Sequence, residues 1–243
     1  MGRLVSVCSA RSMTLARSVT VDGRALPVTL RRNARSCRLS LRIDPSGERL
    51  VVVAPPHVSE RLILDFVQDK EEWVARQLAS QPQPVPFADG VIFPLLGEPQ
   101  RIVHRPDARR GVWAEDGAVH VSGQVEHLPR RLTDWLKARA REEIGTRVQT
   151  HAATLGVRPG RITLRDTRTR WGSCSHKGDL SFSWRLVLAP VNIVNYVAAH
   201  EVAHLSVFDH SPKFWAVVAR LVEDHEQAQS WLKQKGSGLH RYG

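Results

Sequence analysis

The stretch AAHEVAHLSVFDHSPKFW, from Ala198 to Trp215, holds three histidines, at positions 200, 204 and 210, and a glutamate beside the first of them. Residues four apart lie on one face of a helix, about one turn apart, so His200 and His204 can reach one ion. Zinc prefers neutral nitrogen ligands in a tetrahedral array, and a neighbouring glutamate can take a proton from the water that the metal activates. The pentad HEVAH therefore predicts a metal site with Glu201 as its base; the alternative is a helix that carries histidines by chance.

The residues around the pentad favour the metal site. Apolar side chains recur at helical spacing and predict a buried amphipathic helix over residues 191–207. They are Ile193, Val194, Val197, Ala198, Val202 and Leu205. Burying two imidazoles and a carboxylate without partners would cost several kcal/mol. A metal ion with its water is the simplest partner for all three groups.

His210 is the predicted third ligand. If the helix continued, His210 would lie about 240° around its axis from His204, so the helix must end between them. Ser211 and Pro212 predict this break, because they are a good N-cap and first residue for a new helix that reaches Leu221. Metzincins share the ligand spacing but have a glycine midway between the second and third histidines. Val207 stands there in this chain, which predicts a differently built turn. Other residues could be metal ligands instead, or could accept hydrogen bonds from the histidine N–H groups: Asp209, Glu223, Asp224 and His225.

A second segment, TRTRWGSCSHKGDLSFSWRLVLAP, spans Thr167 to Pro190. Its alternation predicts a strand over residues 180–184, with an extended edge at residues 170–175. Together with the pentad, the third histidine and SPKFW, these motifs resemble the YgjP-like metallopeptidase domain, a zincin family related to the SprT-like proteases. The resemblance is close from Arg158 to Leu232. It implies zinc on His200, His204 and His210, with Glu201 as the general base.

Cysteine use and length predict a cytoplasmic enzyme. Cys174 can ligate zinc as a thiolate, but we expect it to be structural because three histidines already complete a catalytic set. Three cysteines without regular spacing among 243 residues suit a reducing compartment. No apolar run reaches the ~20 residues needed to cross a membrane. Residues 1–17 read as a disordered tail, a transit peptide being the alternative.

The remaining pattern predicts an α+β protein, with an N-terminal β-rich lobe and a C-terminal zincin-like helical core with a small sheet. We expect the lobe over residues 18–125 and the metallopeptidase core over residues 126–243. The lobe should contain a helix near residues 59–78, and a long helix near residues 128–155 should open the core. The predicted strands of the lobe lie near residues 19–21, 26–30, 38–43, 50–54, 91–103 and 112–121.

The formal charge of +11 and the pI near 10.5 fit two interpretations. Arginines gather in the first hairpins, where strand alternation can place several on one exposed face that would attract nucleic acid. A biased base composition of the gene would also give many arginines. The cluster comprises Arg31, Arg32, Arg35, Arg38 and Arg42.

Three functions fit these residues. The first is a zinc-dependent peptidase that acts on peptides or proteins through Glu201. The second is a metal-dependent nucleotide pyrophosphatase, with Arg168, Arg170 and Lys177 binding phosphates. The third is a nucleic-acid-associated protein with a structural zinc, against which Glu201 counts, because a closed structural site has no use for a base. We expect no membrane partner, and the oligomeric state and the oxyanion-stabilising group stay open.

Overall fold

The computed structural model describes residues 12–21, 23–44, 48–79 and 83–243. The chain forms two compact units, Met1–Pro82 and Gln83–Gly243. Residues 83–125, which we expected in the N-terminal lobe, belong to the second unit because their apolar side chains join its core. Among them are Phe93, Ile102 and Val119, all fully buried. The α+β fold class is confirmed, but the boundary between the units lies some forty residues before the predicted one.

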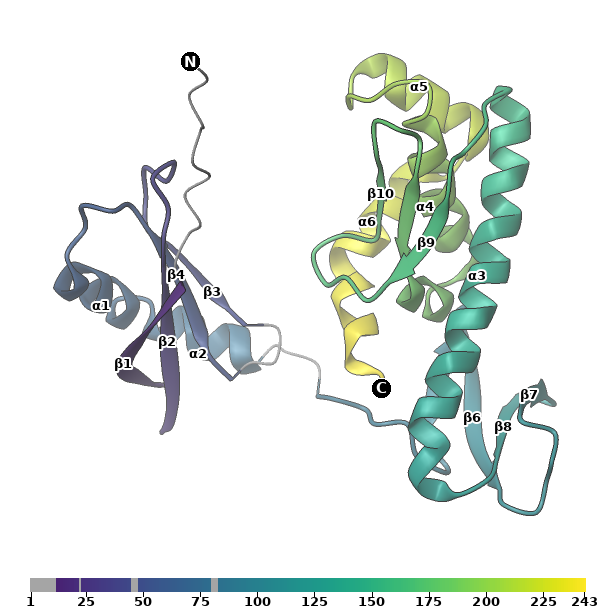
Figure 1. Cartoon of the computed structure of the whole chain (residues 1–243), viewed down its shortest axis with the longest axis horizontal. Helices are drawn as coiled ribbons and strands as arrows, with labels where there is room; N and C mark the ends of the chain where they lie inside the picture. Colours follow the sequence, from purple (N-terminus) through teal and green to yellow (C-terminus); the bar gives the residue numbers. More distant parts are fainter. Residues whose placement is uncertain (1–11, 22, 45–47, 80–82) are drawn as a thin grey trace, which may run out of the picture. The chain divides into compact units, whose positions relative to one another are not determined.

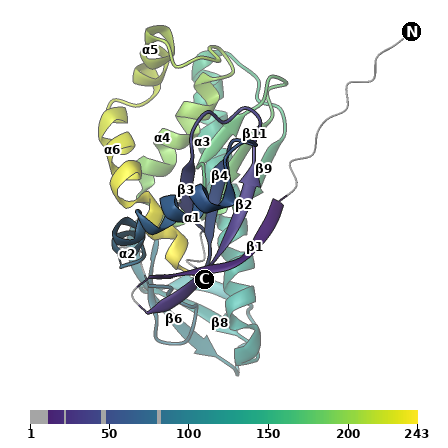
Figure 2. The same ribbon diagram turned by 90° about the vertical axis from the view of Figure 1, so that its left-hand side faces the viewer.

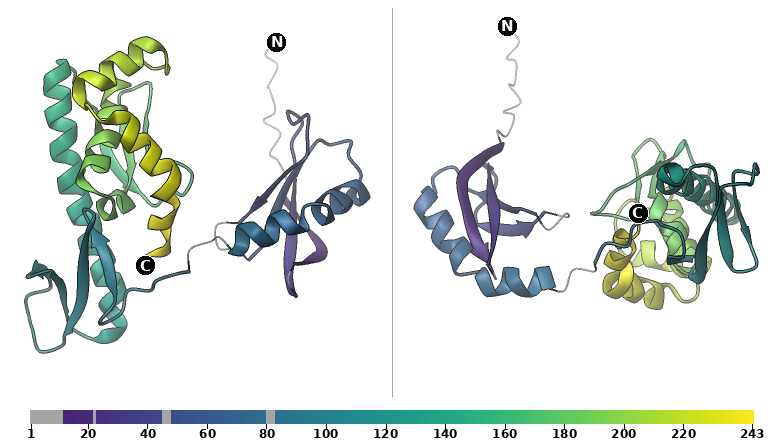
Figure 3. Two further views of the ribbon diagram at one scale, coloured as in Figure 1. Left: turned by 180° about the vertical axis from the view of Figure 1, so that it is seen from behind. Right: turned by 90° about the horizontal axis from the view of Figure 1, so that it is seen from below.

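The first unit is a four-stranded sheet in the order β1-β2-β4-β3, with two helices on one of its faces (Figure 3). Its elements are β1 (Ser12–Val21), β2 (Arg24–Arg32), β3 (Ser40–Ile43), β4 (Leu50–Ala54), α1 (Glu60–Gln68) and α2 (Glu71–Ala79). Strands alternate their side chains between two faces, so Leu30 and Val52 pack toward the helices with Ile63 and Val67. The unit therefore has its own hydrophobic core.

Two predictions for this unit differ from the structure. The predicted tail lies outside the described residues as far as residue 11, but β1 begins at Ser12, inside the segment expected to be disordered. The single predicted helix is two helices, because a short-range bond from Lys70 N–H to the Val67 carbonyl ends the first one. Ser59 caps α1 as expected, accepting a hydrogen bond from Leu62 N–H at 3.3 Å.

The arginines of the first hairpins divide between two roles. Arg31 and Arg42 are exposed on the sheet face opposite the helices, and their partners on β4, Val53 and Val51, are two residues apart. Arg32 instead donates to the carbonyls of Pro55, Pro56 and Val58, at 2.7–3.1 Å. The Arg32 guanidinium group thus stabilises the segment that follows β4. It does not add to the exposed basic face.

The second unit packs two small sheets and its helices around one core. The strands are β5 (Ile92–Leu95), β6 (Glu98–Arg105), β7 (Val112–Glu115), β8 (Ala118–Ser122), β9 (Ile162–Arg165), β10 (Gly172–Cys174) and β11 (Leu180–Ser183). The α-helices are α3 (Leu128–Leu155), α4 (Val191–Ala203), α5 (Pro212–Leu221) and α6 (His225–Lys235), with 3-10 turns at Val125–His127, Trp184–Leu188 and Gly236–Arg241. The sheet orders are β5-β6-β8-β7 and β10-β11-β9.

Helix α4 lies at the centre of this unit, between α3 and α6 (Figure 2). The sheet that contains β9 and β10 covers a further side of α4 (Figure 1). Because neighbours surround it, nine of the thirteen residues of α4 are buried. Its histidines and Glu201 are therefore held on a rigid, packed element. No helix in the described part of the chain has the length and apolar character to cross a bilayer.

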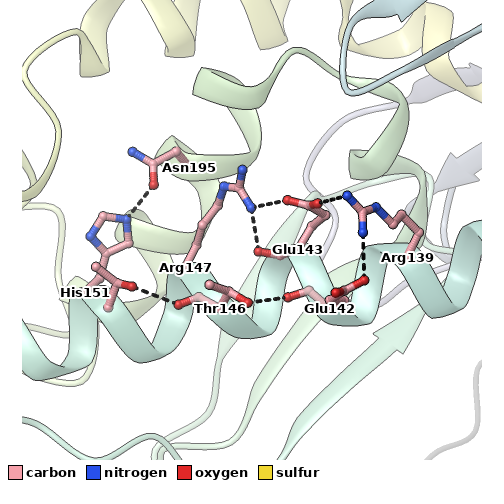
Figure 4. A network of polar contacts seen from close by, with 8 residues as sticks. Arg139, Glu142, Glu143, Thr146, Arg147, His151 and Asn195 are labelled. Carbon is pink, nitrogen blue, oxygen red and sulfur yellow. Dashed lines mark hydrogen bonds and ion pairs between the residues drawn. The ribbon is translucent and has the colours of Figure 1, made fainter. Parts of the chain in front are cut away.

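A polar network joins α3 to α4 (Figure 4). Along α3, Arg139 and Arg147 both pair with Glu143. One turn further, the buried His151 donates from Nε2 to Asn195 Oδ1 of α4 at 2.9 Å. Burial lowers the pKa of His151, and its hydrogen bond to Asn195 opposes that shift. The neutral imidazole is thus the form that the folded protein favours.

This network yields a prediction for stability. Because the folded-state pKa of His151 lies below the ordinary value of 6.5, the unfolded chain takes up the proton more readily. His151 therefore costs stability as the pH falls below about 6.5. In His151→Gln, which keeps an amide donor but cannot titrate, the unfolding free energy should fall less between pH 7 and pH 5 than in the wild type. Urea titrations at both pH values measure the difference, and equal losses would contradict it.

Candidate metal centre

Helix α4 brings His200, Glu201 and His204 together and then ends. It stops at Ala203 with His204 as its C-cap, four residues before the predicted end. Two short-range bonds then turn the chain, from Leu205 N–H to the Val202 carbonyl and from Ser206 N–H to the Ala203 carbonyl. Val207 keeps a negative φ, because the only described non-glycine residues with positive φ are Leu96 and Asp116. As expected, this turn needs no left-handed residue.

The start of α5 positions His210. Pro212 is the first residue of α5, as the sequence predicts, and Ser211 is extended before it. Ser211 makes no side-chain cap; instead, its N–H donates to Asp209 Oδ1 at 3.2 Å. This bond closes the loop between the helices, and His210 points back toward the end of α4. Asp209, a fallback ligand, thus holds the loop.

The three imidazoles form one group of potential ligand atoms. One ring nitrogen from each of His200, His204 and His210 lies within 4.8 Å of the others. The Nε2 atoms of His200 and His210 are 3.2 Å apart. Nitrogen ligands of a tetrahedral zinc, at about 2.0–2.1 Å from the metal, lie about 3.3 Å from one another. The separation of His200 Nε2 and His210 Nε2 therefore fits a shared ion of this size.

Hydrogen bonding and burial prepare the imidazoles as ligands. His204 Nδ1 lies 3.1 Å from the Val207 carbonyl, which can only accept, so this nitrogen carries the proton and Nε2 keeps its lone pair. Burial, followed by the charges of His204 and His210, lowers the pKa of His200 to about 4. Burial also lowers the pKa of His204. Neutral imidazole, the form that binds metals, is thus favoured at neutral pH.

Aromatic side chains enclose the cluster from α4 and α5. The fully buried Phe214 ring lies 4.4–4.9 Å, centroid to centroid, from all three imidazoles. Tyr196, one helical turn before His200, places its hydroxyl 3.5 Å from His200 Nδ1. We did not single out Tyr196 from the sequence, although its spacing of four from His200 is a usable signal.

Glu201 lies beside this cluster, buried beneath β10. Its side chain is only 5% exposed, and a Cβ atom at Gly172 of β10 would lie 2.6 Å from Glu201 Cγ. Only glycine therefore lets β10 approach so closely. Burial raises the pKa of Glu201 to about 8, and the positive charge of Arg170 opposes this rise. Without a metal, Glu201 is thus mostly protonated at neutral pH, and a cation bound beside it would favour the carboxylate form that a general base requires.

Trp171 and Cys174, both close to Gly172 in the chain, have structural contacts. The Trp171 ring stacks on His240 with a centroid distance of 5.0 Å, which fastens the start of β10 to the C-terminal turn. The Cys174 thiol lies outside the group of potential ligands. Burial, followed by the charges of Glu201 and Asp179, raises its pKa to about 11, so it stays a neutral thiol. These contacts favour the structural role expected for Cys174.

Comparisons with known proteins place the chain in a family. The family model described as YgjP-like, metallopeptidase domain, matches residues 37–235. No curated protein matches the chain. Two similar solved structures are the metallopeptidase zymogens of Pyrococcus abyssi abylysin (21% identity, TM-score 0.34) and Methanocaldococcus jannaschii jannalysin (18% identity, TM-score 0.35). Each similarity covers 38% of this chain and 95% of the other chain. The chain belongs to the YgjP-like metallopeptidase family and is therefore a metal-dependent hydrolase of peptide bonds.

Proposed function

We propose that the protein is a zinc peptidase, in which His200, His204 and His210 bind one Zn²⁺ and Glu201 is the general base. The observation that carries this proposal is the group of three imidazoles whose ligand nitrogens lie within 4.8 Å, next to a buried carboxyl. Three nitrogen donors leave one coordination position open, as in catalytic zinc sites. The all-nitrogen donor set favours zinc over Mg²⁺ or Ca²⁺, which prefer oxygen ligands.

Zinc held there would act as a Lewis acid that polarises the peptide carbonyl and makes water more acidic. Glu201 accepts the proton of the attacking water and then delivers it to the leaving amine. The packing of Gly172 keeps the Glu201 side chain in place during both transfers. The carboxyl is buried, so bulk water does not compete for the proton.

Strand β10 offers a place for the substrate backbone. It is the edge strand of its sheet and pairs only with β11 among the described strands. The carbonyl of Trp171 and the N–H of Ser175 bond toward β11, so the backbone groups of Gly172 and Cys174 point to the open edge. An extended peptide can add to such an edge through main-chain hydrogen bonds. It would then pass beside Glu201.

An assay of the purified protein with peptide libraries and nucleoside triphosphates, side by side, tests the function. We expect peptide cleavage that stops after chelation and returns with Zn²⁺. Zinc-dependent release of pyrophosphate or phosphate, without cleavage of any peptide, would support the pyrophosphatase alternative and overturn our proposal.

Gly172→Ala should impair catalysis without removing the metal. The added methyl group would overlap the Glu201 side chain, since its nearest neighbours there include Cγ at 2.6 Å and Cδ at 2.7 Å. Moving a catalytic group by about 1 Å can cost roughly a hundredfold in rate. We therefore expect kcat to fall by about two orders of magnitude with zinc content unchanged. Gly145→Ala, at a helical glycine with open space around it, is the matched control. Wild-type kcat in Gly172→Ala would show that Glu201 needs no such packing.

A further inference from the structure

A basic recess lies on the sheet formed by β9, β10 and β11. Its volume is about 540 Å³, and we call it the outer recess. Three arginines line it, together with hydroxyl side chains from each strand. These residues are Arg161, Arg165, Arg170, Thr163, Ser173 and Ser181.

The strand register places the hydroxyls in a row. Ser173 of β10 lies opposite Ser181 of β11, which lies opposite Thr163 of β9. The neighbouring residues Leu180 and Phe182 are buried in the core that contains α4. Because side chains alternate along a strand, the hydroxyl row faces away from that core. The recess is thus on the outer face of the sheet that covers Glu201.

The recess carries an excess of positive charge. The three arginine side chains are exposed, and none forms an ion pair with another residue in the described ranges. Asp179 also lines the recess, and its Oδ1 accepts a hydrogen bond from the backbone N–H of Arg161 at 2.9 Å. Three guanidinium groups and one carboxylate leave a net positive site. Guanidinium groups and hydroxyls are donors suited to a carboxylate.

The outer recess borders the proposed metal site through β10. Arg170 lines the recess, and its charge also acts on the Glu201 carboxyl. Cys174 lines the recess too, while Gly172, two residues earlier, packs on Glu201. Strands are spaced by about 4.8 Å, so the recess extends about 10 Å from β10 to β9. A glutamate side chain and the long arginines can bridge that width.

We propose that the outer recess binds an acidic side chain of the peptide substrate, so that the enzyme prefers Asp or Glu close to the bond it cleaves. This inference rests on the proposed peptidase function. A peptide extended along the edge of β10 turns alternate side chains to the outer face. A carboxylate there meets Arg170 first and Arg161 and Arg165 across the hydroxyl row. A neutral or basic side chain would leave the net positive charge of the recess unbalanced.

The test uses peptides that differ in one residue, Glu, Gln or Lys, at each position around the cleaved bond. With the zinc-loaded enzyme, we expect kcat/KM for Glu to exceed that for Gln by roughly tenfold at one position, as a charged hydrogen bond permits, with Lys lowest. The Arg161→Gln/Arg165→Gln double variant should bring the Glu-to-Gln ratio close to one. Arg165→Glu leaves two positive and two negative side chains in the recess, so it should remove the preference for Glu over Lys. Arg109→Gln, an exposed arginine on the β6–β7 loop, is the control and should keep the wild-type ratio.

Binding provides a second measurement that does not depend on turnover. The same peptides should bind zinc-loaded Glu201→Gln, which does not turn them over, with a Glu preference that is lost when Arg161→Gln and Arg165→Gln are added, as measured by calorimetry. Equal affinity and equal kcat/KM for Glu and Gln, or a preference that survives in the double variant, would overturn the inference and leave the peptidase function intact. If no peptide is cleaved, the peptidase function fails, whereas the calorimetric preference still decides whether the outer recess binds carboxylates. Displacement of the Glu peptide by nucleoside triphosphate alone would assign the recess to phosphate instead.

Discussion

We expect Glu201→Gln to reduce peptide hydrolysis by roughly 10²- to 10⁴-fold, the usual contribution of a positioned general base, while zinc content stays at one per chain. Gln has nearly the shape of Glu, so the packing against Gly172 should persist. The amide cannot accept the proton of the attacking water. The loss should therefore appear in kcat, with little change in peptide affinity.

Three measurements separate this effect from misfolding. Elemental analysis gives the zinc content, calorimetry gives peptide binding, and steady-state kinetics give kcat. Loss of activity accompanied by loss of zinc would assign Glu201 a structural role. Turnover like that of the wild type would exclude Glu201 as the base and would require another proton acceptor near β10.

Replacing His204 with Ala should have the second largest effect, removing both zinc and activity. His204 is 8% exposed, its Nδ1 lies 3.1 Å from the Val207 carbonyl, and no further His, Cys, Asp or Glu of the described residues joins the group of potential ligands. Losing one of three protein ligands leaves too few donors for a stable zinc site. A bound metal also stabilises the fold, by about 4 kcal/mol when its free concentration is a thousand times Kd. The variant should thus lose the zinc-dependent part of its thermal stability.

Melting curves with and without added Zn²⁺ measure this difference. The wild type should melt at a higher temperature with zinc, and His204→Ala should show the same melting temperature in both conditions. His57→Ala, an exposed histidine of the first unit, is the control and should keep the zinc response. Full zinc content in His204→Ala would contradict the proposed ligand set. His200→Ala and His210→Ala are expected to behave like His204→Ala.

Local sequence patterns were sufficient to predict many of the helices of the second unit. The apolar periodicity and the Pro212 start signal correctly predicted α3 from Leu128 to Leu155 and α5 from Pro212 to Leu221. The break between His204 and His210 followed from helical geometry, since six residues of continuous helix would separate the imidazoles. Such features depend on residues close in sequence, and the sequence alone can therefore reveal them.

Other features depend on contacts between distant segments. The strands of residues 83–125 share their hairpin pattern with the first unit, and only the burial of Phe93 and Ile102 in the second core assigns them to it. The early end of α4 at Ala203 is different, because the His204 side chain bonds to the Val207 carbonyl only three residues on; this contact is local, but the apolar spacing does not reveal it.

By itself, the sequence determined which side chains form the proposed metal site, because the spacing of four and the helix break are local properties of the chain. Only the tertiary structure decided how Glu201 is buried, because its cover comes from Gly172, twenty-nine positions earlier. The same holds for the outer recess. Arg161, Thr163, Ser173 and Ser181 become neighbours through the pairing of β9, β10 and β11, a parallel and an antiparallel register that no local pattern encodes.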